Sequence, residues 1–512
     1  MIAAVCVLFS IVIAVLVRWL WLKKVQFAKT IPHAEPYYPV LGNLPMALGK
    51  SPDEMFYVLH ECFRKYDRLF TLHLGPLVAL GVTHPELIQK ILNHPDCQEK
   101  PDVYKVVRLP KGLLAARYET WKVHRKTLNS TFNIRILHSF LPIFIDCSSK
   151  LINRLNRYAE SGETCNILEY IAECTLEMIS RTSLGGKALE REGRQDFIDN
   201  LEVALTTLGK RLFNVLLHND FVYRFTELYR NEMKAINICH RFTDKIIAEK
   251  RIELGSPGMD ENGNEIDKTF QHQEPQENDC YRRPQIFIDQ LMKMPLTSTG
   301  AYSFTDQEIS DHIYTMIVAG NETSATQLAH TCLLLSMHPD IQERAYQEVR
   351  DFIISADIFA DADVLKNLVY VEAVLKEAMR LMPVAPIIAR ENLQDVVLDG
   401  CTIPKGTLLL MNFYSLHRRE DIWGDNADRF NPQRFLGDEM KQRHAYAHLP
   451  FSGGPRGCIG YRYAKMSLKI LLALILKNFK LSTDLESKDI RYHYQISLNL
   501  DGPHAIRLEK RL

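Results

Sequence analysis

Residues 451–460 read Phe-Ser-Gly-Gly-Pro-Arg-Gly-Cys-Ile-Gly and lead directly into an apolar run with helical periodicity. Four glycines in this segment allow the backbone to lie close to a large planar partner. Cys458 stands where the helix is expected to begin, so the helix dipole and its free N–H groups would stabilise a thiolate. Arg456 offers a cation to an anionic group on the same partner. The segment therefore predicts a thiolate that serves as a soft axial ligand for iron.

The other ten cysteines are scattered along the chain, and none forms a C-x-x-C pair. This spacing excludes zinc ribbons and thioredoxin-type redox motifs, and we interpret these cysteines as small buried apolar residues. The 512 residues include 62 basic and 62 acidic side chains. Such a balance argues against a protein that binds nucleic acid through a basic surface. The composition, 46% hydrophobic and 24% charged, is that of a reduced, intracellular globular protein.

Helical periodicity dominates the chain outside the cysteine segment. Apolar residues recur at spacings of three and four over 136–158, 198–252, 305–337, 340–354, 368–381 and 460–479. Short strand-like runs occur at 68–74, 78–83, 396–399, 407–411 and 491–499. The pattern predicts a mainly α fold with minor β, in which small sheets are appended to a helical core around one long central helix. The polar, turn-rich stretch 254–284 is expected to form an exposed loop.

The run 305–337 is the expected central helix. Thr305 and Glu308 have the spacing of a capping box, and Pro339 lies just beyond the expected end. Within the run, Gly320 lowers helix stability, and Thr323 can bond back to a carbonyl one turn earlier. Local rules that are broken inside a core element often mark a functional position.

The first 22 residues are apolar apart from Ser10 and Arg18. About 20 apolar residues suffice to span a bilayer as a helix. The first charges lie on the C-terminal flank, which predicts a retained signal-anchor with a cytosolic body. A cleaved signal peptide, the alternative, would carry positive charge before the apolar run. We therefore expect an anchor over 1–22, a proline-rich hinge over 23–46 and a catalytic domain over 47–512.

The pattern F-x-x-G-x-R-x-C-x-G at 451–460 resembles the haem-binding loop of the cytochromes P450, the haem-thiolate monooxygenases. Further patterns resemble that family in the family's order: Trp121-x-x-x-Arg125, Ala319-Gly320-x-Glu322-Thr323, Glu377-x-x-Arg380 and Ala-Asp-Arg-Phe-Asn-Pro-Gln-Arg-Phe at 427–435, where Ala427 replaces the usual proline. An isolated E-x-x-R is an ordinary intrahelical ion pair. Five patterns in the correct order make coincidence implausible, and the resemblance covers essentially the whole chain.

The resemblance implies haem b with Cys458 as the axial thiolate ligand. It also implies four partners for the two haem propionates, which need cations or donors in a partly buried site: Trp121 through its indole N–H, Arg125, Arg390 and Arg456. Phe451 would shield the sulfur atom or would simply pack in the core.

Two further groups take their roles from the same resemblance. Glu377, Arg380 and Arg434 would form a buried charged triad that fixes the cysteine loop without doing chemistry. Thr323 and Glu322 would manage protons at the dioxygen pocket. A solvent-facing carboxylate is the alternative interpretation of Glu322.

The substrate side is expected to be apolar, which predicts a lipophilic substrate. Met316, Ala319, Ile387 and Ile388 should line the pocket, together with the 100–118 loop and helices within 200–235. The chain most resembles the insect and vertebrate group that includes fatty-acid ω-hydroxylases. Many of those enzymes carry a glutamate where Ala319 stands and use it for a covalent haem link, so no such link is expected here.

The resemblance also implies partners. Electrons would come from an NADPH-cytochrome P450 reductase in the endoplasmic reticulum membrane, with cytochrome b5 as an optional second donor. Candidate docking cations, which could equally be solvated surface residues, are Lys122, Lys126, Arg462 and Lys465. Two alternatives use the same fold: an isomerase or dehydratase that acts on peroxides without O₂, and a haem protein that stores or senses ligands. Reductase-dependent consumption of NADPH separates a monooxygenase from both.

Overall fold

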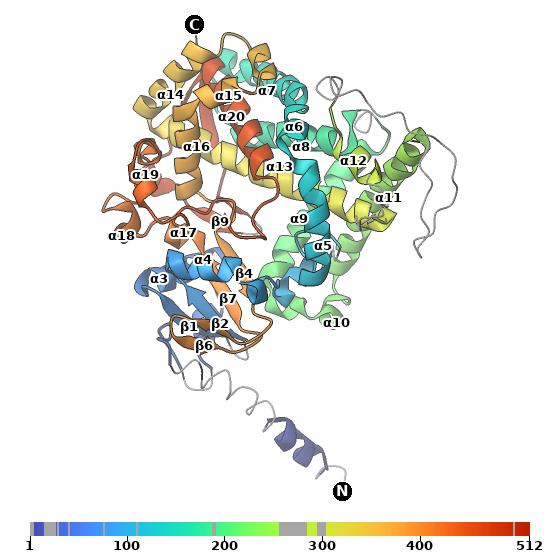
Figure 1. The fold of residues 1–512 in the computed structure, drawn as a ribbon, viewed down its shortest axis with the longest axis vertical. Coiled ribbons are helices and arrows are strands. Elements are labelled where there is room, and N and C mark those ends of the chain that lie inside the picture. Colours follow the sequence, from blue (N-terminus) through green and yellow to red (C-terminus); the bar gives the residue numbers. More distant parts are fainter. Residues whose placement is uncertain are drawn as a thin grey trace. The chain divides into compact units, whose positions relative to one another are not determined.

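The computed structural model describes residues 5–14, 27, 30–38, 41–74, 77–108, 111–186, 191–254, 284–293, 304–494 and 497–511 (Figure 1). The chain forms two compact units. Unit 1 comprises 1–101, 386–428 and 441–457, and unit 2 comprises 102–385, 429–440 and 458–512. The prediction of a mainly α fold with small sheets is confirmed. The predicted loop over 254–284 lies, apart from its two end residues, outside the described residues.

Unit 1 is built on a four-stranded sheet in the order β1-β2-β7-β4. Its strands are β1 (Leu69–Leu74), β2 (Leu77–Val82), β7 (Leu408–Asn412) and β4 (Ile387–Glu391). Strand β2 runs parallel to β7, and the other neighbouring pairs are antiparallel. A hairpin of β5 (Val396–Leu398) and β6 (Cys401–Ile403) and helices α2 (Leu44–Ala47), α3 (Pro52–Lys65), α4 (Pro85–Asn93), α17 (Phe413–Leu416) and α18 (Glu420–Trp423) complete it.

Unit 2 is organised around α13 (Asp306–Met337), the yellow helix in Figure 1. The predicted capping box is confirmed: the Glu308 N–H donates to Thr305 Oγ1 over 3.3 Å, and the Thr305 N–H donates to Glu308 Oε2 over 3.1 Å. Pro339 begins the next helix, α14 (Pro339–Phe352), because proline lacks an N–H and is tolerated in a first turn. Most of α13 is buried, and it packs chiefly against α8 (Ile167–Leu184).

The other main helices of unit 2 are α5 (Tyr118–Leu128), α6 (Ile134–His138), α7 (Leu141–Ser161), α9 (Arg194–Phe213), α10 (Asp220–Tyr223), α11 (Glu227–Leu254), α12 (Phe287–Lys293), α15 (Val364–Asn367), α16 (Val369–Leu381) and α20 (Tyr461–Asn478), and the short α19 (Glu439–Gln442) has residues in the ranges of both units. Two small sheets accompany them. One has the order β3-β11-β8, formed by β3 (Cys165–Asn166), β11 (Ala505–Lys510) and β8 (Phe479–Ser482), and the other pairs β9 (Tyr492–Tyr494) with β10 (Leu498–Leu500).

The periodic runs over 198–252 and 491–499 each span more than one element. The helical periodicity over 198–252 covers three helices, α9, α10 and α11. Asn214 takes an extended backbone conformation at the end of α9, and the Asn219 side chain accepts hydrogen bonds from two N–H groups of α10. The strand-like run over 491–499 contains the antiparallel pair β9 and β10. Apolar periodicity continues through both breaks, which is why it did not reveal them.

The predicted membrane anchor is described only in part. Residues 5–14 form a helix with exposed apolar side chains such as Leu8 and Phe9. Within the described residues, no helix is long and apolar enough to cross a membrane. The rest of the predicted anchor over 1–22 lies outside the described residues.

Candidate active site

Cys458 lies just before α20, whose N-cap residue is Gly460. Its side chain is accessible to solvent, although protein atoms surround it on most sides. Burial raises the pKa of the thiol, while a hydrogen bond from the Gly460 backbone and the charge of Arg125 lower it. The expected thiolate-stabilising groups are therefore present, but burial outweighs them in the free thiol. Metal binding would supply the missing driving force for loss of the proton.

Two glycines of the 451–457 segment pack closely against other residues of unit 1. Gly454 has φ +68°, and a Cβ atom there would lie 2.0 Å from the Leu92 carbonyl oxygen. A Cβ atom at Gly453 would lie 2.7 Å from the Tyr446 ring. These two glycines are therefore required by contacts within the protein, whatever lies against the rest of the segment. Phe451 is half-buried in the same unit.

Three cations gather in unit 1. Arg390 on β4 and Arg456 in the glycine segment are both buried. Burial and the charges of these two arginines hold the pKa of Lys100 well below its usual range. The backbone places Lys100 there, because the Glu391 N–H donates to the Glu99 carbonyl over 3.0 Å. This cluster of basic side chains suits an anionic partner, and no sequence pattern marked Lys100.

Trp121 and Arg125 lie on α5 in unit 2, four residues apart and therefore on one face of the helix. Trp121 is buried, and Arg125 is half-buried with its Nε donating to Asn129 Oδ1 over 3.0 Å. Burial lowers the pKa of Arg125, and the charge of Cys458 raises it. The structure thus brings Arg125 into electrostatic contact with the predicted ligand.

The structure assembles the predicted charged triad. Both Glu377 oxygens accept from Arg380, Oε2 from Nε over 2.7 Å and Oε1 from Nη2 over 2.8 Å. Arg434 Nε lies 3.4 Å from Glu377 Oε1, and the Asn431 backbone N–H donates to the same oxygen over 2.8 Å. All three charged side chains are buried. The triad therefore ties α16 to the short 3₁₀ turn Pro432–Phe435.

The middle of α13 stays helical through 319–323. As the sequence suggested, Thr323 Oγ1 donates to the Ala319 carbonyl one turn earlier, over 2.6 Å. Ala319 and Thr323 are the exposed residues of this stretch, whereas Met316 is buried. Gly320 has a packing role, because a Cβ atom there would lie 2.9 Å from Ile179 on α8.

Glu322 has a partner that the sequence did not reveal. The Ser497 hydroxyl, just before β10, donates to Glu322 Oε1. Burial raises the pKa of Glu322, and this hydrogen bond lowers it. The Glu322 carboxyl group therefore lies among protein atoms, which disfavours the alternative of a freely solvated surface carboxylate.

The two predicted pocket residues of unit 1 lie next to each other on β4. Ile387 and Ile388 are both half-buried, and successive side chains of a strand point to opposite faces. Ile388 packs against the apolar core of unit 1. Their role in a substrate pocket stays a prediction.

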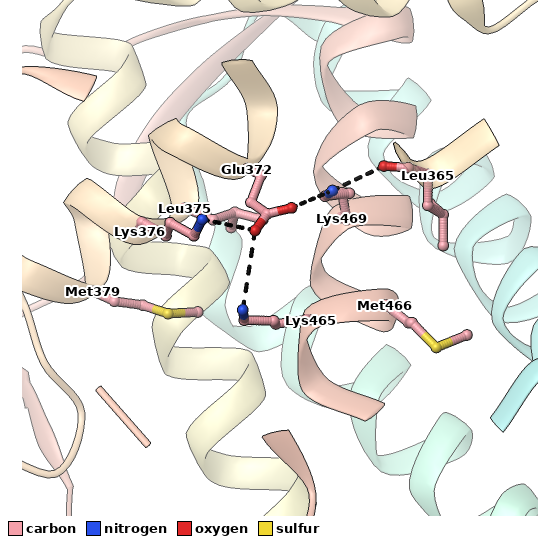
Figure 2. Close-up of a pocket in the computed structure, with 8 residues that line it drawn as sticks. All are labelled: Leu365, Glu372, Leu375, Lys376, Met379, Lys465, Met466 and Lys469. Atoms are coloured by element: carbon pink, nitrogen blue, oxygen red, sulfur yellow. Dashed lines mark hydrogen bonds and ion pairs between the residues drawn. The ribbon is translucent and has the colours of Figure 1, made fainter. Parts of the chain in front are cut away.

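A small pocket of about 90 Å³ lies between α16 and α20 in unit 2 (Figure 2). Its apolar walls include Leu375, Met379 and Met466. Glu372 lies beside three lysines: Lys376 Nζ is 2.8 Å, Lys469 Nζ 2.7 Å and Lys465 Nζ 4.0 Å from its oxygens. The pocket therefore carries a net positive charge.

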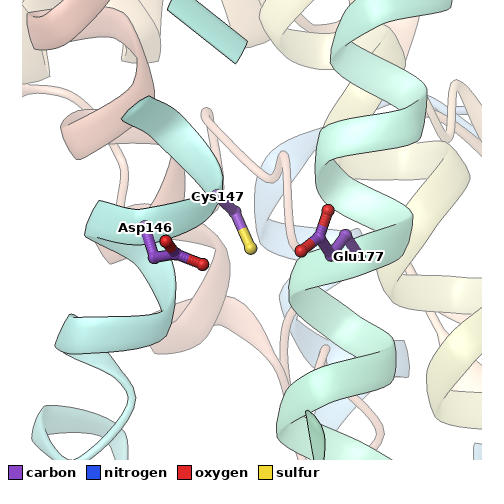
Figure 3. Close-up of side chains that lie close together, drawn as sticks. All are labelled: Asp146, Cys147 and Glu177. Atoms are coloured by element: carbon purple, nitrogen blue, oxygen red, sulfur yellow. The ribbon is translucent and has the colours of Figure 1, made fainter. Parts of the chain in front are cut away.

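Another cluster within the described residues has side chains of the types that bind metals, but two cationic side chains already neutralise its carboxylates. Ligand atoms of Asp146, Cys147 and Glu177 lie within 4.8 Å of one another (Figure 3). Lys150 forms ion pairs with both carboxylates, and so does Arg181. Burial raises the pKa of the Cys147 thiol to about 12. The cluster is therefore an ion-pair network.

The residues present fit a haem with an axial thiolate, since an accessible thiol lies beside an N–H donor and an arginine. The sequence profile of the cytochrome P450 family matches residues 32–504. This chain belongs to the cytochrome P450 family. It is therefore an oxidoreductase of the monooxygenase class, and the family's haem-thiolate cofactor is implied.

Similar proteins cover nearly the full length of the chain. Cytochrome P450 4c21 of Blattella germanica is 29% identical over 95% of this chain and 94% of its own length. Cytochrome P450 4d2 of Drosophila melanogaster is 30% identical over 94% of each chain. Cytochrome P450 4g1 of the same fly is 29% identical over 96% of this chain and 90% of its own.

Proposed function

We propose that this cytochrome P450 binds haem b and inserts one atom of O₂ into a lipophilic substrate: RH + O₂ + NADPH + H⁺ → ROH + H₂O + NADP⁺. Bound haem supplies dioxygen activation, and the protein supplies the ligand, the orientation and the proton path. The observation that carries the proposal is the accessible Cys458 thiol ahead of α20, with Gly460 and Arg125 as its electrostatic partners.

The remaining roles follow from the residues already placed. Arg125, Arg390, Arg456 and Trp121 bind the propionates, and Lys100 joins them. Thr323 presents its hydroxyl oxygen on the exposed face of α13, where the oxygen can accept a hydrogen bond while its proton is donated to the Ala319 carbonyl, and Glu322 exchanges protons with solvent. Phe451 shields the sulfur, and Met316, Ala319, Ile387 and Ile388 line an apolar substrate pocket. An apolar lining is what a lipophilic molecule requires.

Electrons come from NADPH-cytochrome P450 reductase, with cytochrome b5 as an optional donor. Lys122, Lys126, Arg462 and Lys465 are exposed, which suits docking of an acidic flavoprotein. An anchor over 1–22, followed by a hinge over 23–46 and a catalytic domain over 47–512, holds the enzyme at the endoplasmic reticulum membrane. The exposed apolar side chains in 5–14 support this placement.

The test is the CO difference spectrum of the reduced protein, wild type beside Cys458→His. A thiolate-type Soret band that is lost in the variant supports the proposal, and a histidine-type band in the wild type contradicts it. Reductase-dependent NADPH consumption with formation of a hydroxylated product then distinguishes the monooxygenase from an O₂-independent isomerase.

Docking can be tested separately through charge. We expect Lys465→Gln to raise the KM for reductase a few-fold at low salt and less at high salt, because screening weakens contacts between exposed charges. Lys488→Gln, which changes an exposed lysine paired with Glu486, is the matched control. An equal effect of both substitutions would contradict a specific docking role for Lys465.

A further inference from the structure

Four side chains of unit 2 form a loop of three hydrogen bonds whose two ends lie on α13. Ser497 Oγ donates to Glu322 Oε1, and Asn499 Nδ2 donates to Ser497 Oγ over 3.1 Å. Thr326 Oγ1 donates to Asn499 Oδ1 over 3.0 Å. Thr326 lies one turn after Glu322, so both side chains are on the same face of the helix.

The hydrogen bonds of the loop all run in one direction. Because the Asn499 amide oxygen accepts from Thr326, the amide NH₂ group faces Ser497. A serine hydroxyl has one proton, and the only acceptor that the loop leaves for it is Glu322. The donors therefore run along the loop toward Glu322 Oε1, and among the described residues no hydrogen bond is made to Oε2, the oxygen that can gain and release a proton.

The backbone that carries Ser497 and Asn499 is firmly held. Between them, the buried Leu498 donates its N–H to the Val384 carbonyl over 2.9 Å. Asn499 is paired with His493 across the β9–β10 ladder. Ser497 and Thr326 are each only 2% exposed, so water has little access to these two hydroxyl groups. The donors are therefore preorganised.

We propose that Ser497, oriented by Asn499 and Thr326, is a positioning residue that holds the Glu322 carboxyl group in the orientation from which it exchanges protons during catalysis. This inference rests on the proposed function, since Glu322 is assigned to proton transfer there. A fixed donor restricts the rotamers of the carboxyl group and stabilises its ionised form. In this proposal Ser497 acts through Glu322, because its hydroxyl donates to Glu322 Oε1.

The electrostatics give the sign of the effect. Burial raises the pKa of Glu322, and the Ser497 hydrogen bond lowers it. Removing the hydroxyl should therefore raise the pKa further, by about one unit, the size expected for a hydrogen bond to a charged group. The pH midpoint that depends on Glu322 should move upward by the same amount.

The experiment uses the full-length holoenzyme and its variants Ser497→Ala, Ser497→Thr, Glu322→Gln and the double variant of Ser497→Ala with Glu322→Gln. The CO difference spectrum first establishes that each protein is folded and loaded. Infrared titration of the resting ferric protein then follows the carboxyl C=O band that Glu322→Gln removes. Product formed per NADPH and peroxide released are measured across the same pH range.

We expect Ser497→Ala to raise the infrared midpoint and the midpoint of product yield together, and to increase peroxide release. Ser497→Thr should restore both midpoints, because it keeps the hydroxyl. The double variant should match Glu322→Gln alone, since Ser497 acts through that carboxyl group.

Three outcomes would overturn the inference. They are unmoved midpoints in Ser497→Ala, an additive loss of yield in the double variant, and a loss of yield in Ser497→Ala that Ser497→Thr does not repair. If Glu322→Gln itself leaves product yield unchanged, the proposed role of Glu322 fails and the inference fails with it. If Glu322→Gln lowers the yield but Ser497→Ala does not, only the inference fails.

Discussion

Glu377 on α16 and Glu322 on α13 are two carboxyl groups of unit 2 with contrasting partners. Glu377 accepts a bidentate pair of bonds from Arg380, lies beside Arg434 and is fully buried. Glu322 has a neutral partner, the Ser497 hydroxyl, and burial raises its pKa. Cations that surround a carboxylate fix its charge, whereas a hydroxyl orients it and leaves it able to gain a proton. The first arrangement suits a structural anchor, and the second suits proton exchange.

The largest effect should come from breaking the triad of Glu377, Arg380 and Arg434. Glu377→Ala strands two buried arginine charges, and we expect a loss of about 3–5 kcal/mol in the free energy of unfolding together with loss of holoprotein. Chemical denaturation and the yield of protein with a thiolate-type CO spectrum measure both. Asp363→Asn is the control, because its ion pair with Lys366 is exposed and should contribute nothing measurable. Equal losses in the two variants would contradict the structural role of the triad.

Changing Glu322, whose partner Ser497 is uncharged, should affect catalysis and leave the free energy of unfolding nearly unchanged. Glu322→Gln keeps an acceptor for Ser497 but cannot carry a proton, so product formed per NADPH should fall about 10²-fold, the low end for general acid–base groups. Peroxide release should rise as product falls. Denaturation curves close to wild type complete the expectation, and a large loss of stability would show that Glu322 is a structural residue like Glu377.

Glu372 provides an intermediate case, since three lysines surround it but it is partly exposed. Burial alone would raise its pKa, but hydrogen bonds from Lys376 and Lys469 outweigh burial and lower it to about 2. A lowered pKa means that the carboxylate stabilises the fold above its ordinary value of 4.5, and that this contribution is lost as the pH falls toward 2.

Glu372→Gln should therefore be less stable than wild type at pH 7, and the difference should shrink as the pH falls below about 4.5. Urea midpoints of both proteins at pH 7 and pH 3 test this expectation. A difference that is constant across this range would mean that the lysines do not recognise the charge of Glu372.

The smallest effect is expected at the far end of the hydrogen-bond loop. Thr326→Val keeps the side-chain shape but removes the donor to Asn499. Cooperativity strengthens each bond in such a chain by roughly 10–30%, so the pH midpoint of product yield should rise by about 0.2 unit, less than in Ser497→Ala. A shift as large as that of Ser497→Ala would mean that Thr326 holds Glu322 by another route.

Features that depend on local sequence were predictable. The capping box at Thr305, the back-bond of Thr323 and the pairing of Glu377 with Arg380 join residues three or four positions apart, and the structure has all of them. Helix and strand periodicity gave the fold class for the same reason. The breaks within 198–252 and 491–499 were missed, because the chain can turn between two helices or two strands while the spacing of apolar residues continues unchanged.

The sequence by itself determined the family, the candidate thiolate ligand, the pair Glu322 and Thr323 on α13, and the members of the charged triad. Each of these lies in a short pattern of fixed spacing. The tertiary structure decided which neutral groups meet Glu322 and which lysine joins Arg390 and Arg456. Ser497 lies 175 positions from Glu322, and Glu99, the neighbour of Lys100, is bonded to Glu391 of β4 through the backbone. No local pattern marks either residue, because their partners are brought to them only when distant strands and helices pack.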